Sequence, residues 1–527
     1  MHSHEATEPG TRPATVLPWL NGPAIATAIL LLCAPFALVE VPPLIDMPGH
    51  IGAAAIEAAG PGSPLQQYFG WRWMFTLNLG GQVLMKLLQM RLTLLEAGWW
   101  STVLATALLA LGCLGVTRVL NPRGGYGFAW ALIFVFSFPL LTGFLNFVLA
   151  TGIALTVFAA AVALERRPAE RALLLIVAQP VALLSHAIGG ALLPVLVVTH
   201  AVGGLIDDRV RDPRAIAARL LASCWPLAAS VATLALWKLT ATPGHGGMIW
   251  NLNVKLWSWI FLLRDQSFAL DIGTVFACLA VLVAGYAWGA RWSARQALPA
   301  LTVALLFVVA PASIDGSAFV DTRLLPVALL LLLALQDWGP VARRRAQAVA
   351  LAGVALLAAR TTVTAASFVD YADDYEVQLS ALDHVQHGSR VLAFVEHSCV
   401  RESWRNDRRD HLASLASLYR GAWVNDNWSV PGLDMLITHY QPGSKINYWA
   451  DPSAFVWSRA CSGGVHLRGI DQALRHAPLQ QVDYVWLIDT GLPLEDDPRL
   501  APVWQVGRSV LFAVKPLGFL SGKPRQG

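Results

Sequence analysis

Long apolar segments separated by short polar turns fill the first two thirds of the chain. Runs of about 20 apolar residues recur up to about residue 366, and each can cross a bilayer core about 30 Å thick. The pattern predicts eleven membrane-spanning helices, at residues 23–41, 92–117, 126–143, 147–164, 172–186, 189–206, 220–240, 268–289, 297–311, 324–339 and 347–366. Residues 51–59 are predicted to form a short interfacial helix, and residues 77–89 an interfacial or re-entrant one.

The pattern changes after residue 366. Short apolar runs at 391–395 and 482–488 predict strands, and 503–505 with 510–514 predict a terminal hairpin. We therefore expect a mainly α membrane domain at 23–366, with a long first loop at 42–76, followed by a soluble α/β domain at 367–527. Seven tryptophans of that domain are expected mostly in its core, although stacking on sugars is an alternative: Trp404, Trp423, Trp428, Trp449, Trp457, Trp486 and Trp504.

Composition supports a membrane protein. Only 14% of the 527 residues are charged and the mean hydropathy is +0.52, whereas a soluble chain carries about 25% charged residues. From residue 367 onward there are 15 Lys and Arg against 18 Asp and Glu, and before it 23 against 16. The first apolar run ends in Val-Glu-Val-Pro-Pro without a small-residue cleavage site, so we expect a retained helix rather than a signal peptide.

Basic residues predict the orientation in the membrane. The turns containing Arg118, Arg166, Arg209, Arg291 and Arg343 are rich in arginine, and the alternate turns contain few basic residues, among them Arg72, Lys255, Arg264 and Arg323. The positive-inside rule places the arginine-rich turns in the cytoplasm. An odd number of spans then places the tail at 1–22 in the cytoplasm and the domain at 367–527 outside the plasma membrane.

Ionisable residues of both signs gather in the turns predicted to lie outside. Such groups cost about 2.5–3.5 kcal/mol each at the centre of a membrane helix, and their convergence from distant loops favours an active site or binding cleft. Asp46 lies in Val-Pro-Pro-Leu-Ile-Asp-Met-Pro-Gly-His, where the prolines stiffen the backbone as a positioned general base requires. His50 follows four residues later. The alternative is an N-cap aspartate with a solvated histidine.

Arg323 begins a very apolar predicted helix, where a positive charge is rare. Its guanidinium is expected to bind a lipid phosphate with two hydrogen bonds; the alternative is an exposed ion pair with Asp321. Lys255 and Arg264 lie in a tryptophan-rich loop. They are candidates for the same anion site, or for cations that reach out from an aromatic belt.

Two more polar residues interrupt apolar hairpins. His186 is a candidate substrate ligand or a histidine satisfied by nearby carbonyls, and Asn146 a candidate ligand or a helix cap. Of the six cysteines, Cys399 and Cys461 alone fall in the domain predicted to lie outside, where oxidation is permitted. We expect them to form a disulfide that closes a loop of about 60 residues and stabilises the domain by about 4 kcal/mol.

No phosphate loop, zinc-binding His-Glu-x-x-His helix or Cys-x-x-Cys pair is present. The order of a first span, an outer loop opening with an acid and interfacial helices, many spans and an outer C-terminal domain resembles the GT-C glycosyltransferases. Short strings at 44–50, 143–147 and 321–326 are also similar to those of uncharacterised bacterial membrane proteins of this kind. The chain departs from the pattern in having no clear second acidic motif, which leaves metal use open.

The resemblance implies transfer of a sugar from a polyprenyl-phosphate donor to an envelope glycan, lipid or protein. Asp46 matches the acid that deprotonates the acceptor, and Arg323 and Lys255 would stabilise the leaving phosphate. It implies membrane lipids as partners, no nucleic acid, and no cofactor other than a possible divalent metal. The rival functions are a transporter or flippase of a lipid or glycan, and a noncatalytic scaffold for envelope assembly.

Overall fold

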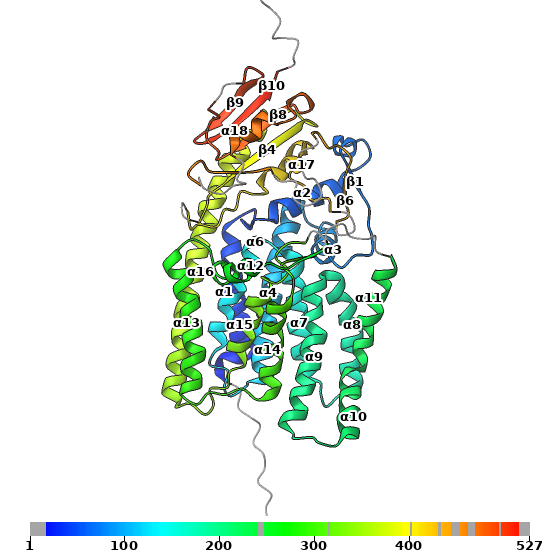
Figure 1. Ribbon diagram of the computed structural model, residues 1–527, viewed down its shortest axis with the longest axis vertical. Helices are drawn as coiled ribbons and strands as arrows, with labels where there is room; N and C mark the ends of the chain where they lie inside the picture. The colour runs from blue at the N-terminus through cyan, green and yellow to red at the C-terminus, as the bar shows by residue number, and fades with distance from the viewer. Residues whose placement is uncertain are drawn as a thin grey trace, which may run out of the picture.

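The computed structural model describes residues 17–240, 247–314, 317–400, 403–430, 434–443, 454–461, 469–494 and 497–515. It consists of a helical bundle with a smaller domain containing a sheet, called here the sheet domain, on one end (Figure 1). Seven helical segments are long and apolar enough to cross a membrane: α4 (Leu94–Leu120), α7 (Leu145–Ala163), α8 (Pro168–Ser185), α9 (Ala187–Asp207), Pro213–Thr240, α13 (Phe268–Ala287) and the segment Arg343–His384.

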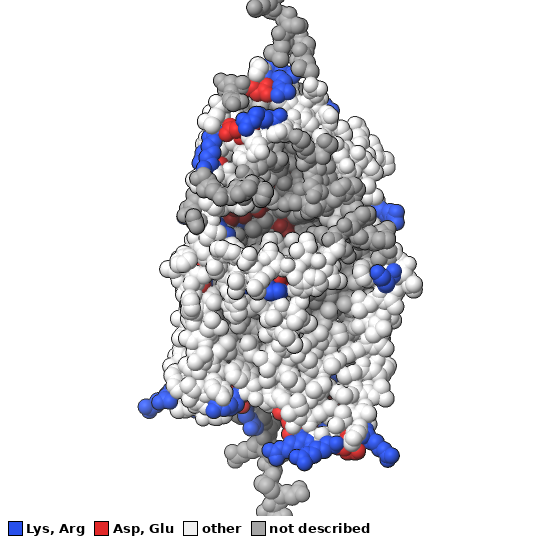
Figure 2. Space-filling model, viewed as in Figure 1, with Lys and Arg blue, Asp and Glu red and all other residues white. Residues whose placement is uncertain are grey.

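Four shorter apolar segments lie among these helices: Gly22–Leu38, Phe128–Thr142, α14 (Ala294–Val309) and α15 (Leu324–Leu335). Large apolar side chains such as Leu239, Val283 and Phe276 remain exposed on the bundle surface. Lys and Arg gather at the end of the bundle away from the sheet domain, and few charges show on the visible face between the two ends (Figure 2). Exposed apolar helix surfaces of this kind indicate a membrane protein.

Several predicted helices are divided or extended. Residues 126–143 form three pieces instead of one helix: α5 (Phe128–Leu132), a 3₁₀ turn Ile133–Phe136, and α6 (Phe138–Thr142). The break falls at Ser137, whose extended backbone precedes Pro139 in α6. Segment 213–240 likewise divides into α10 (Pro213–Cys224) and α11 (Ala228–Thr240) around Pro226, and Gly22–Leu38 into α1 (Gly22–Cys33) and the 3₁₀ turn Ala34–Leu38 around Pro35.

Helix α16 (Arg343–Leu379) continues well past the predicted end at residue 366 and reaches the sheet domain (Figure 1). The reason is that its last turns bury Phe368 and Tyr375, so packing prolongs a helix whose sequence is no longer uniformly apolar. The tryptophan-rich loop also contains an unexpected helix, α12 (Leu252–Phe261). Strand β2 (Met248–Ile249), just before α12 in the sequence, pairs antiparallel with β3 (Ser313–Ile314).

The first loop connects the bundle to the sheet domain. Helix α2 (Met47–Ala58) starts earlier than the predicted 51–59, and α3 (Gly80–Leu88) falls within the predicted 77–89. Between them, β1 (Phe69–Trp71) pairs antiparallel with β6 (Leu436–Thr438). Ile56, Leu65 and Phe69 share a buried cluster with Leu392 and Phe394 of the sheet, so the loop packs against one face of that sheet.

The main sheet has the strand order β5-β4-β8-β10-β9, with β7 also paired to β4. Strands β5, β7 and β8 run parallel to β4, and β10 is antiparallel to β8 and β9. The four predicted strands are present with somewhat different ends, as β4 (Arg390–His397), β8 (Tyr484–Ile488), β9 (Leu500–Val506) and β10 (Ser509–Val514). Two strands that the sequence did not predict, β5 (Trp423–Val424) and β7 (Ala454–Trp457), join them. Alternate residues of β4 enter separate buried clusters on the two faces. Helices α17 (Leu415–Arg420) and α18 (Ile470–Arg475) complete the domain.

Candidate functional site

Asp46 occupies the N-cap position of α2, but its side chain makes no capping hydrogen bond. Its backbone N–H donates to the Thr142 carbonyl at 2.8 Å. Gly143 follows with a φ of +90°, and a Cβ there would lie 2.9 Å from the Asp46 nitrogen. The turn after α6 therefore fixes the backbone of Asp46, while its carboxylate is 16% exposed at the junction of the bundle and the sheet domain.

The closest basic group from the sheet domain is His411, which sequence reasoning missed. Its Nε2 lies 3.8 Å from Asp46 Oδ1, and its Nδ1 lies 2.8 Å from Asp426 Oδ1. Burial opposes protonation, but the charges of Asp426, Asp46 and Asp410 and the hydrogen bond to Asp426 outweigh it and raise the pKa of His411 to about 9. His411 is therefore an imidazolium at neutral pH, held between two carboxylates.

His50 contributes a neutral ring to the same region. Burial lowers its pKa to about 4, a hydrogen bond with the Gly143 backbone acts in the opposite direction, and the charge of His411 lowers the pKa further. Its ring centroid lies 5.7 Å from that of Trp428, which in turn lies 4.3 Å from that of His411. Gly49 packs so closely on Trp428 that a Cβ would not fit. This close packing joins α2 to the sheet domain.

Arg323 lies at the start of α15 and is only 8% exposed. Its Nη2 donates to the Ala318 carbonyl at 3.0 Å and its Nη1 lies 2.9 Å from His186 Nε2. Among the described residues its Nε has no hydrogen-bond partner. Within the described part of the chain no carboxylate comes within ion-pair distance of this guanidinium. Asp46 is close enough for its charge to act on Arg323. The predicted base and the predicted anion-binding residue are thus electrostatic neighbours.

Both ring nitrogens of His186 face N–H donors, one of which belongs to Arg323. His186 is the N-cap of α9, and its Nδ1 faces the amides of Ile188 and Gly189 at 3.2 and 3.3 Å. A neutral imidazole has one acceptor nitrogen, so it cannot accept from these amides and from Arg323 at once. The guanidinium carbon of Arg323 lies 3.9 Å from the centroid of the Phe144 ring. Arg323 therefore has N–H donors, Nε among them, that no described protein group accepts.

The other predicted cation, Lys255, has its charge satisfied. Lys255 Nζ lies 2.7 Å from Asp321 Oδ2 and donates to the carbonyls of Phe307 and Ala310. Asp321 is fully buried and also accepts the Thr322 amide. The sequence alternative of an exposed Asp321–Arg323 pair is therefore wrong, because Asp321 faces Lys255. Arg264 binds the carbonyls of residues 403–405 instead of lying near Arg323.

Asn146 serves a structural contact in α7. Its carbonyl accepts the Gly81 amide and its amide group faces Asn78 and Gln82, so it anchors α3 to the bundle. It does not cap α7, because Phe144 occupies that position.

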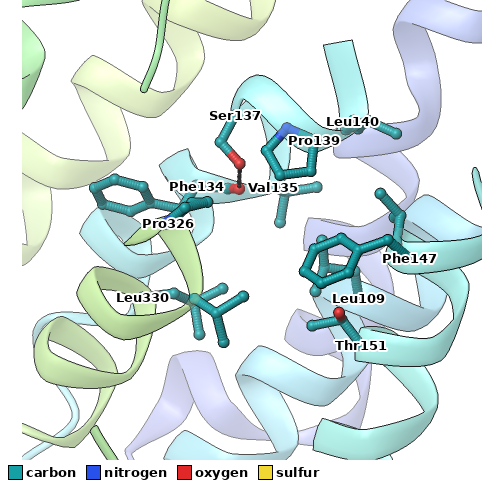
Figure 3. Close-up of a pocket in the computed structure, with 12 residues that line it drawn as sticks. Leu109, Phe134, Val135, Ser137, Pro139, Leu140, Phe147, Thr151, Pro326 and Leu330 are labelled. Carbon is teal, nitrogen blue, oxygen red and sulfur yellow. Dashed lines mark hydrogen bonds between the residues drawn. The ribbon is translucent and has the colours of Figure 1, made fainter. Parts of the chain in front are cut away.

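The pocket in Figure 3 is apolar and contains none of the predicted site residues. Its Ser137 hydroxyl is turned to the Phe134 carbonyl at 2.7 Å, so this pocket offers packing space and little chemistry.

The loop that carries His411 is clamped to the bundle by buried charges. Arg408 Nη2 lies 2.5 Å from Asp265 Oδ1, and Thr364 of α16 donates to Asp265 Oδ2 at 2.7 Å. Nearby, Trp404 Nε1 and Arg360 both bind Asp271, at 2.7 and 2.9 Å. These contacts dock the sheet domain on the end of the bundle that holds Asp46.

The predicted pair Cys399 and Cys461 is joined in the structure by a disulfide, with the Cα atoms 5.7 Å apart. The bond closes a loop that includes His411, Asp426 and Trp428.

Among the described residues, no group of three or more His, Cys, Asp or Glu side chains is arranged to hold a metal ion. Comparison with protein-family models, curated proteins and solved structures found no match to this chain.

Proposed function

We propose that this protein is a membrane glycosyltransferase that transfers a sugar from a lipid-phosphate donor to an envelope acceptor. Two features of the site carry the proposal. Arg323 is a buried guanidinium with no carboxylate within ion-pair distance in the described chain, and the charge of Asp46 is close enough to act on it. Arginine favours phosphate because its planar donors match two phosphate oxygens. The resemblance to GT-C enzymes supports the same reading.

In the proposed reaction Asp46 takes the proton of an acceptor hydroxyl as that oxygen attacks the anomeric carbon. The bond from the anomeric carbon to the phosphate oxygen breaks, and the lipid phosphate leaves with its electron pair. Arg323 stabilises the negative charge on that phosphate, in a site where little water competes. A donor with a lipid tail would explain why the phosphate-binding residue begins a bundle helix.

For the arrangement in the membrane we propose eleven spans, with the tail at 1–22 in the cytoplasm and the sheet domain outside the plasma membrane. Support comes from the match between the seven long and four shorter apolar segments and the eleven predicted ranges. The basic end of the bundle lies away from the sheet domain (Figure 2), as the positive-inside rule requires of a cytoplasmic face. The proposed site then opens outward.

Transfer of labelled sugar from a panel of polyprenyl-phosphate sugars, by the full chain in lipid nanodiscs, tests this function. Asp46→Asn should lower the rate by about 10²–10⁴-fold, as loss of a general base does, with donor binding retained. Arg323→Gln should mainly weaken donor binding. Arg72→Gln, a change at an exposed arginine, should behave as wild type.

Two results would reject the proposal. One is wild-type transfer by Asp46→Asn. The other is an absence of transfer with every donor in the panel. Movement of the donor across sealed vesicles by the wild-type protein, without any transfer, would favour the flippase alternative instead.

A further inference from the structure

The sheet domain contributes a basic group, His411, to the neighbourhood of the proposed base. We propose that His411 is a positioning residue, which holds the Asp46 carboxylate in place and in its charged form, so that the sheet domain completes the active site. This inference rests on the proposed function. It adds to that function a residue, His411, and a structural unit, the sheet domain, that lie far from Asp46 in the sequence.

The two ring nitrogens of His411 face two different carboxylates. Asp426, in the loop after β5, binds Nδ1 at 2.8 Å and so orients the ring with Nε2 toward Asp46 at 3.8 Å. Asp426 is itself fixed, because it accepts the Ser414 amide at 3.2 Å and its carbonyl accepts the Ser414 hydroxyl. The His411 side chain is only 6% exposed, and its ring packs on Trp428. An ion pair with Asp426 alone would not require the second nitrogen to face the first loop.

Charged and titratable groups reach His411 from each neighbouring segment. Asp46 and His50 come from the first loop and α2, Asp410 precedes His411 in its own loop, and Asp426 follows β5. Three of these four are acids, which favour the imidazolium, and His50, with its pKa lowered to about 4, is neutral at pH 7. Because an opposite charge within about 4–6 Å favours the charged form of a group, the imidazolium keeps the half-buried Asp46 ionised and ready to accept a proton.

The docking contacts explain how a residue of the sheet domain can be placed this accurately. The loop before His411 is held by Arg408 on Asp265, and Tyr371 and Tyr375 of α16 donate to the carbonyls of Asn406 and Arg408. Thus α16 links the bundle to the loop directly. The Asp46–His411 distance is set by packing on both sides of the junction.

The pH–rate profile of transfer by the full chain tests this role. The wild-type rate should fall at high pH because His411 loses its proton near pH 9 and then no longer holds the Asp46 carboxylate in place as an ion pair. His411→Gln should lose this alkaline limb and move the acid limb upward by about 1–3 pH units, the shift expected when a nearby opposite charge is removed. His476→Gln, an exposed histidine of the same domain, is the matched control and should keep both limbs.

Replacing His411 with glycine leaves space for free imidazole, which allows a test of whether added imidazole restores activity. His411→Gly should lose activity and regain part of it when imidazole is added, whereas Asp46→Asn should not respond. A residue with only a structural role would move neither the pH limbs nor the response to imidazole. Unchanged limbs in a folded His411→Gln protein would overturn the inference and leave the proposed function standing.

A substrate-free measurement separates the two proposals. Thermal stability of wild type, Asp46→Asn, His411→Gln and the double variant forms a cycle, in which the two changes should be non-additive at pH 7 and additive above pH 10. The reason is that the stability from a raised histidine pKa is complete below pH 6.5 and is lost as the pH rises through about 9. Additivity at pH 7 would overturn the His411–Asp46 interaction whatever the reaction proves to be.

Discussion

The buried pair between Arg408 and Asp265 predicts a large and specific loss of stability on substitution. Arg408 is 0% exposed, Asp265 is 2% exposed, and their side chains lie 2.5 Å apart. Arg408→Met preserves much of the packing on Phe368 and Tyr371 but leaves a buried carboxylate without its cation. Breaking a buried pair in this way costs about 3–5 kcal/mol. Because Thr364 also donates to Asp265, part of its hydrogen bonding survives, and we expect a value near the lower end.

The assay is urea unfolding of the full chain in detergent, followed by tryptophan fluorescence. Adding Asp265→Asn to Arg408→Met should recover most of the loss, because the amide no longer carries a buried charge. Arg499→Met, which removes a more exposed pair with Asp497, should cost only about 0–1 kcal/mol. If Arg408→Met cost no more than this control, or if Asp265→Asn gave no recovery, the argument that buried charges dock the sheet domain would be refuted.

Three further predictions use other parts of the chain. Replacing Cys399 by Ser should lower the unfolding free energy by about 4 kcal/mol, because a 62-residue separation is no longer closed, and should abolish the mobility change between reduced and unreduced gels. Lys255→Met should sharply reduce the melting temperature, since it leaves Asp321 buried and charged, and adding Asp321→Asn should restore much of it. A reporter active only outside the cytoplasm should work when fused to the sheet domain and fail at 340–346; the reverse pattern would contradict the proposed orientation.

Hydropathy and alternation predict much of the fold because membrane helices and sheet strands have strong physical signatures. The apolar run that forms α7 has to satisfy its backbone internally, and only a helix does so in one segment. Both faces of β4 are buried, so the strand is a short run of apolar residues that can be recognised in the sequence. The breaks in 126–143 and the extension of α16 were not predictable in the same way, because they depend on contacts with segments distant in sequence.

For the site, the sequence indicates individual residues better than it indicates which of them contact each other. Asp46 stands out because prolines stiffen its segment, and Arg323 because a positive charge is rare at the start of a very apolar helix. The alternative for Arg323 was an ion pair with its near neighbour Asp321. Residues two apart at a helix start face different directions, and Asp321 meets Lys255 of another segment instead. His411 gave no local signal. Its importance comes from Asp46 and Asp426, which the fold brings to its two ring nitrogens from separate parts of the chain.

The division of the proposed site between two structural units has a consequence for how its variants should fail. Arg323 and His186 belong to bundle helices, so loss of Arg323 should weaken the binding of a lipid phosphate and leave the sheet domain docked. Arg408 touches neither Asp46 nor the proposed phosphate site, yet its loss loosens the loop that places His411. Its variants should therefore lose stability and transfer rate together while donor binding persists. Measuring donor binding and transfer rate separately in Arg323→Gln and Arg408→Met distinguishes the two kinds of failure, and equal loss of both quantities in both variants would contradict a site built from two units.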